Sequence, residues 1–212
     1  MDKETARVEA FSDGVFGIAM TLLILEFRVP ELSHGNVNAR GELINALLAL
    51  WPSAVAYLLS FGTILIMWIN HHGLFKHAHG ADNRLLFANG FLLLVITFLP
   101  FPTKVLAEYL DRRAANVAAT LYCGSFVLVS IGYNLLLWSV VVNRRHGAPG
   151  SEKIIARVKR AYRLGLSAYV LATVVAMFWP YIGVAICFSL WPLWAILRYY
   201  DREFYSSSAK LD

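Results

Sequence analysis

Residues 7–26 read RVEAFSDGVFGIAMTLLILE, and this stretch decides the fold class. The run over residues 11–27 is almost wholly apolar, and Arg28 and Pro30 follow it closely. A helix needs about 20 apolar residues to cross the hydrocarbon core of a membrane. The stretch therefore predicts a membrane-spanning helix, and it is an unusual one because it contains the carboxylate of Asp13.

The composition of the whole chain points to the same class. Of its 212 residues, 58% are hydrophobic and only 16% are charged, and the mean hydropathy is +0.55. Soluble domains are about 45–50% apolar and about 25% charged. These values exclude an ordinary soluble enzyme, a disordered protein and a nucleic-acid-binding protein. They predict an integral membrane protein.

Six apolar runs are long enough to be considered as membrane spans. They cover residues 11–27, 43–69, 85–107, 117–142, 164–179 and 181–197. The runs lack the alternation of barrel strands, so we expect an all-α polytopic protein with one domain over residues 1–212. Pro100 and Pro102 should kink or end the third span. Trp179-Pro180-Tyr181 should join the last two spans in a tight hairpin.

The basic residues then predict the orientation. With the N-terminus inside, 14 of the 19 Lys and Arg residues lie in inside segments and 5 lie in outside segments. This asymmetry favours both termini in the cytoplasm. The largest contribution comes from the basic stretch 144–163. We interpret it as a topological determinant, and binding of nucleic acid or anionic lipid is the alternative.

Polar residues in and near the spans form the first candidate site. A carboxylate in hydrocarbon is costly unless it faces protein, a partner charge or water, so Asp13 should point into the helix bundle. Its role is either a helix-packing hydrogen bond or direct contact with a transported ion. At the end of the second span, His71 and His72 are adjacent and project about 100° apart. We expect one of them to bond across the bundle, with Asp13 as a possible partner and Asn89 in the same network.

Two further patterns leave alternatives open. His71, His72, His77 and His79 invite a metal interpretation, but their spacing matches no usual zinc motif, so no metal site is predicted. Ile18, Thr21, Leu22 and Leu25 recur at helical spacing and form one face of the first span. Taken alone, that periodicity is typical of ordinary helix packing.

The motif around Asp13 resembles a known family. Arg7, Phe11, Ser12 and Asp13, followed by residues 14–26, resemble the opening helix of the prokaryotic transmembrane protein 175 potassium channels, which are relatives of the endolysosomal potassium channel. The segments 68–75 and 89–101 also look like that family.

This resemblance implies a homotetramer of six-span subunits whose first helices line a potassium-selective pore. Ile18 would form the narrowest ring, and Leu22 and Leu25 would form further aliphatic rings beside the hydroxyl ring of Thr21. The remaining motif residues would instead hold the first span against its neighbours: Arg7, Phe11, Ser12, Asp13, Trp68, His71 or His72, and Asn89. The resemblance implies a multi-pass protein of a cell membrane, with lipids and potassium ions as partners, no cofactor, no nucleic acid and no enzymatic activity.

Features of the residues are compatible with a channel and leave two competitors. The chain has no Thr-Val-Gly-Tyr-Gly filter and no arginine repeat of a voltage sensor, so an apolar neck would have to do the gating. One competitor is a proton-coupled secondary transporter that uses Asp13 and the histidines as a relay. The other is a membrane enzyme or metal-binding protein built on the histidines.

Overall fold

The computed structural model describes residues 3–27, 29–30, 39–78, 80–142 and 151–195. Throughout these residues the regular structure is helical. The elements in chain order are α1 (Lys3–Leu22), η1 (Leu23–Glu26), α2 (Ala39–Leu48), α3 (Trp51–Phe75), α4 (Asn83–Phe98), α5 (Pro100–Tyr109), α6 (Ala115–Val142), α7 (Ser151–Ala176) and α8 (Pro180–Ser189). The expected all-α class is confirmed for this part of the chain.

Four helical segments are long and apolar enough to cross a membrane: Lys3–Leu25, Ser53–Phe75, Asn83–Tyr109 and Ala115–Val142. They overlap the first four predicted spans, although the second begins at Ser53 and not at residue 43. The predicted fifth and sixth spans fall on α7 and α8, which are helical but do not meet the same criteria of length and composition. Helix α7 begins at Ser151, within the basic stretch, and the apolar helical segment Pro180–Ala195 is shorter than a full span. The C-terminus lies outside the described residues, so its predicted cytoplasmic position stays a prediction.

Prolines set several of the helix boundaries. The predicted span 43–69 is wrong as a continuous helix, because α2 ends at Leu48 and α3 begins at Trp51. A proline ring clashes with the carbonyl four residues earlier, and for Pro52 that carbonyl belongs to Leu48. The break expected at Pro100 is confirmed, since α4 ends at Phe98 and α5 begins with that proline. Pro180 begins α8, and α8 packs against α7 as the predicted hairpin.

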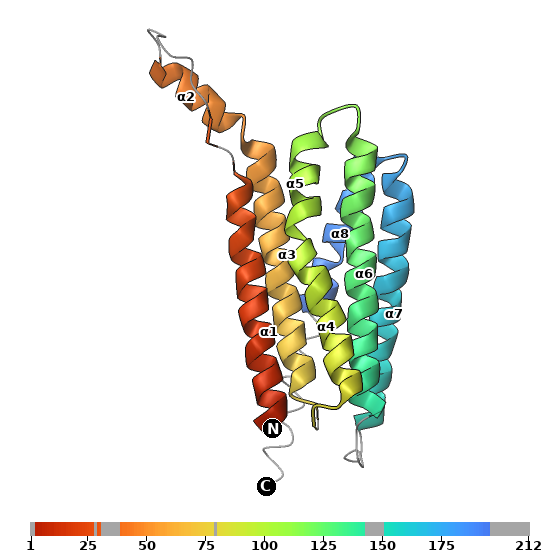
Figure 1. The fold of residues 1–212 in the computed structure, drawn as a ribbon. Helices are drawn as coiled ribbons and strands as arrows, with labels where there is room; N and C mark the ends of the chain where they lie inside the picture. Colours follow the sequence, from red (N-terminus) through yellow and green to blue (C-terminus); the bar gives the residue numbers. More distant parts are fainter. Residues whose placement is uncertain (1–2, 28, 31–38, 79, 143–150, 196–212) are drawn as a thin grey trace.

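The helices form an elongated bundle, with α2 projecting from one end (Figure 1). Helix α6 packs against α4, α5, α7 and α8, and α1 packs against α3 and α4 at the edge of the bundle. The core contains large side chains that are almost fully buried, among them Tyr122, Phe16, Phe75 and Leu92. Because α1 contacts the bundle from one side only, its other side is left uncovered within the subunit.

Candidate functional site

Helix α1 has two regular stripes on opposite faces. The buried stripe repeats every three or four residues and consists of Thr5, Glu9, Ser12, Phe16 and Ala19, with Leu23 of η1 continuing it. The exposed stripe has the same spacing and consists of Phe11, Gly14, Ile18 and Thr21, with Leu25 of η1 continuing it. Residues spaced in this way share one face of a helix. One face of α1 therefore binds it to the bundle, and the other faces away.

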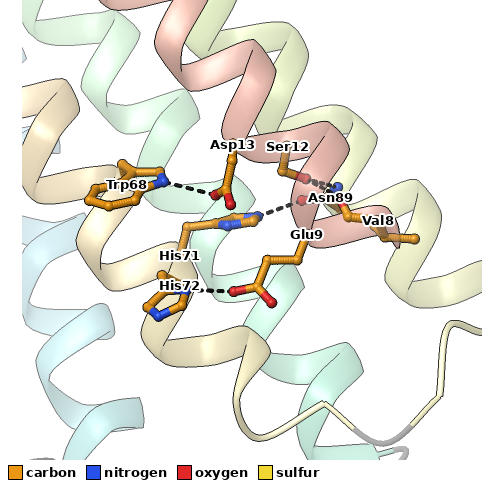
Figure 2. A network of polar contacts seen from close by, with 8 residues as sticks. All are labelled: Val8, Glu9, Ser12, Asp13, Trp68, His71, His72 and Asn89. Atoms are coloured by element: carbon orange, nitrogen blue, oxygen red, sulfur yellow. Dashed lines mark hydrogen bonds and ion pairs between the residues drawn. The ribbon is translucent and has the colours of Figure 1, made fainter. Parts of the chain in front are cut away.

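A chain of three hydrogen bonds joins α3, α4 and α1 (Figure 2). His71 Nε2 lies 2.8 Å from Asn89 Oδ1, Asn89 Nδ2 lies 2.9 Å from Ser12 Oγ, and Ser12 Oγ lies 2.8 Å from the Val8 carbonyl. Because an amide oxygen only accepts, His71 must donate from Nε2, and each following group in turn donates to the next. The direction of the whole chain is therefore fixed, and it leaves Nδ1 of a neutral His71 as the unprotonated ring nitrogen.

The surroundings of His71 are apolar. Its side chain is fully buried, with the Phe75 ring stacked at 4.4 Å and the Phe16 ring tilted at 5.2 Å between centroids. Among the described residues, Nδ1 has no hydrogen-bond partner. The imidazole is therefore held in place by one directional bond and two aromatic contacts.

Two further bonds connect α1 to α3, and Figure 2 shows both. Trp68 Nε1 donates to Asp13 Oδ1 at 2.8 Å, and His72 Nδ1 lies 2.6 Å from Glu9 Oε1. The rings of Trp68 and His72 are stacked, with centroids 6.2 Å apart. The two carboxylates are one turn apart on α1, and the two rings that bind them are one turn apart on α3. Helices α1 and α3 are therefore joined by side-chain bonds at two successive turns.

The pairing differs from the sequence prediction in one respect. Both His71 and His72 bond across the bundle, but neither bonds to Asp13, whose carboxylate accepts from Trp68 instead. Glu9 was missed as a member of the site. Its position one turn before Asp13 would have placed it on the same face of the helix.

Arg7 and Phe11 lie outside this network. Arg7 is exposed, and the Phe11 side chain is 67% exposed. Among the residues that the structure describes, the packing of these two side chains that the resemblance implied is not found. Phe11 instead begins the exposed stripe of α1.

The four residues predicted to line a pore are all uncovered. Ile18 is 58% exposed, Leu25 is 68% exposed and Leu22 is 39% exposed. Thr21 is also exposed, and its hydroxyl donates to the Ile18 carbonyl at 2.9 Å. Since that proton is used within the helix, the lone pairs of Thr21 Oγ1 face outwards and can accept from water or bind a cation. Around Gly14 and Gly17 the subunit leaves open space.

The histidines do not gather into a metal centre among the described residues, where no three His, Cys, Asp or Glu side chains lie close enough to hold an ion. His77 is half-buried, and His79 lies outside the described residues. The polar side chains of the site instead form hydrogen bonds between helices.

Comparisons with known proteins give the family. A family model described as the endosomal/lysosomal potassium channel TMEM175 matches residues 7–100. A potassium channel of Chamaesiphon minutus is 42% identical over 189 residues, which cover 88% of this chain and 91% of that protein. A potassium channel of Streptomyces collinus is 43% identical over 162 residues, which cover 76% of this chain and 75% of that protein. The human endosomal/lysosomal proton channel TMEM175 is 30% identical over 64% of this chain and 28% of its own length.

Comparison with a solved structure gives the same family. The crystal structure of a lysosomal potassium-selective channel TMEM175 homologue from Chamaesiphon minutus matches with a TM-score of 0.81 and 40% identity. The match covers 93% of this chain and 99% of that chain. The similarity therefore extends well beyond the residues that the family model matches, and this chain belongs to the TMEM175 family.

Proposed function

We propose that four copies of this chain assemble in a cell membrane as a potassium-selective channel whose pore is lined by the exposed stripe of α1. The observation that carries the proposal is the contrast between the two faces of that helix. One face is bonded to α3 and α4, and on the opposite side Ile18 and Leu25 are mostly exposed, with Leu22 exposed to a smaller extent. The names of the bacterial relatives and of the matching structure support potassium as the permeant ion.

The chemistry of the stripe suggests how such a pore would work. Around a fourfold axis, Ile18 would form a ring of branched aliphatic groups, and Leu25 would form another ring two turns further along. Narrow apolar rings can gate a pore by dewetting. Between them, the outward lone pairs of Thr21 Oγ1 would replace part of the hydration shell of the ion. A partly dehydrated ion that holds its water loosely would pass more easily, and this favours potassium over sodium.

The polar residues would act as anchors in this arrangement. Ser12, Asp13, Trp68, His71 and Asn89 bond helices to one another on the side of α1 that faces away from the stripe. We assign them the role of fixing the rotation of α1. A proton relay through Asp13 is not proposed, because its bound carboxylate oxygen is held by Trp68 rather than by a histidine.

The test is ion flux through purified protein in liposomes, with potassium and sodium compared. Ile18→Asn should raise the flux and reduce the preference for potassium, because an amide ring hydrates the neck. Leu128→Asn makes the same chemical change on the exposed face of α6 and should leave both quantities unchanged. If Ile18→Asn behaves like Leu128→Asn, Ile18 does not form the neck. A subunit count other than four, measured by native mass spectrometry, would contradict the assembly.

A further inference from the structure

Helix α7 has an exposed face of mixed character. Its buried face consists of Ala161, Tyr162, Gly165, Tyr169, Ala172 and Ala176. On the opposite side, Arg157, Arg160 and Arg163 are exposed, and the exposed apolar residues Leu164, Val170, Leu171 and Val174 follow them on the same side. Met177 and Phe178, just beyond the end of the helix, are also exposed. A single helix face therefore changes from cationic to apolar along its length.

The packing of α7 prevents this face from turning inwards. A Cβ atom on Gly165 would come within 2.4 Å of the Trp194 ring, so the backbone of α7 lies directly against that indole. Trp194 Nε1 also donates to the Tyr169 hydroxyl at 3.0 Å, one turn further along α7. The rotation of α7 is thus fixed, and its three arginines point away from the bundle.

The dimensions of the face match a membrane leaflet and its border. The part of the face from Leu164 to the end of α7 at Ala176 covers about 18 Å at 1.5 Å per residue. Trp179 and Tyr181 follow it, both exposed, at the opposite end from the arginines. Side chains on a helix point towards its N-terminus, so the guanidinium groups of Arg160 and Arg163 reach away from the apolar part towards the lipid headgroups. Figure 1 shows the first turns of α7 at the same end of the bundle as the first turns of α1.

We infer that Arg160 and Arg163, with Arg157 one turn before them, form a binding site for the phosphate headgroups of anionic phospholipids, with the acyl chains lying along the apolar part of the same face. Arg157 also interacts within the chain, so the two later arginines are the main donors, and guanidinium binds phosphate through paired hydrogen bonds. Nucleic acid would not be expected there, because the adjoining apolar surface needs a partner with hydrocarbon. The inference rests on the proposed function, with the apolar part of this face lying in the membrane leaflet nearest the arginines.

The test measures lipid preference without using ion flux. Purified protein is placed in phosphatidylcholine vesicles that contain spin-labelled phosphatidylglycerol or spin-labelled phosphatidylcholine. Electron paramagnetic resonance then gives the fraction of each lipid held at the protein surface. One arginine near an anionic surface gives roughly a fivefold preference, so a site of several arginines should hold phosphatidylglycerol at least about fivefold more strongly than phosphatidylcholine. The preference should fall as salt is raised.

Matched variants decide the outcome. Arg157→Gln, Arg160→Gln and Arg163→Gln together should reduce the preference to less than about twofold. The control variant Arg40→Gln, Arg112→Gln and Arg113→Gln removes the same charge from exposed positions outside α7 and should keep the preference. Replacing the three α7 arginines with Lys keeps the charge that sets the orientation, and it should keep most of the preference.

Two results would overturn the inference. One is a phosphatidylglycerol preference that survives in the α7 glutamine variant. The other is an equal loss of preference in the control variant, which would show that overall charge is responsible. Channel activity can fail independently of either result, because the lipid measurement does not depend on conduction.

Discussion

Replacing Asn89 with Leu tests the central hydrogen bonds of the site. Leu has the same number of side-chain heavy atoms as Asn and the same branch point, so the change removes two bonds between helices without leaving a cavity. In membrane proteins such bonds contribute about 0.6 kcal/mol on average and up to about 1.7 kcal/mol. Two lost bonds thus amount to about 1–3 kcal/mol. Because the Nε2–H of fully buried His71 is left without its acceptor, we expect a loss in the upper part of that range, about 2–3 kcal/mol.

The measurement is unfolding of the purified protein in mixed micelles with increasing dodecyl sulfate, followed by fluorescence of its 6 tryptophans. Asn116→Leu is the matched control. Asn116 is exposed and makes a long bond of 3.4 Å to the Met177 carbonyl, so its replacement should cost less than about 0.5 kcal/mol. A cycle with His71→Phe should give a coupling energy of about 1 kcal/mol, because the two residues share one of the lost bonds.

The reasoning would be refuted by Asn89→Leu and Asn116→Leu having equal effects on the free energy of unfolding. A coupling energy near zero between positions 71 and 89 would refute the assigned bond specifically, even if each single variant were destabilised. Neither result depends on whether the variants conduct ions.

Three further predictions concern close contacts and the second set of bonds, and all three can be checked by thermal unfolding in detergent. Gly183→Ala should be strongly destabilising, by roughly 1–3 kcal/mol, because its Cβ would come within 2.7 Å of the Ala176 Cα and 2.8 Å of the Ala172 carbonyl. The control Gly124→Ala meets only an ordinary contact at 3.7 Å, and its stability should be close to that of the unchanged protein. Gly62→Ala should have an intermediate effect, because it meets the far end of the Trp191 ring at 2.6 Å, and Trp191→Leu should relieve that contact. Trp68→Phe should cost about 1 kcal/mol by removing the donor to Asp13, while Trp138→Phe, at an exposed position on α6, should cost less.

Much of the fold could be predicted from hydropathy because four segments are uniformly apolar over a membrane thickness. The failures have local causes. The run 43–69 contains Pro52, whose effect on the carbonyl of Leu48 interrupts the helix without interrupting the apolar pattern. In α7 the opposite occurs, since charged residues precede the apolar run but the helix continues through them. Hydropathy therefore located the apolar segments better than it located the helix boundaries.

Most members of the polar site could be predicted, but not their pairs. Asp13, Asn89 and one of His71 and His72 were expected in one network, because polar groups at similar depth in a membrane protein must find one another. The family resemblance added Ser12 and Trp68, while Glu9 was missed. Which histidine meets which carboxylate depends on the rotation and axial offset of α1 relative to α3. Those two quantities depend on all the contacts between the two helices, and a single sequence does not contain them.

The rotation and axial offset of α1 explain why an uncovered pore face would need polar bonds on the opposite side of the helix. Lipid tails are as apolar as leucine, so apolar contacts alone provide little force to hold one helix against another or to select its rotation. Hydrogen bonds are directional. A shift of α1 by one residue would rotate it by about 100° and would break the bonds of Ser12 and Asp13 together. The network thus selects one rotation of α1, and that rotation determines that Ile18, Thr21 and Leu25 are the side chains directed away from the bundle.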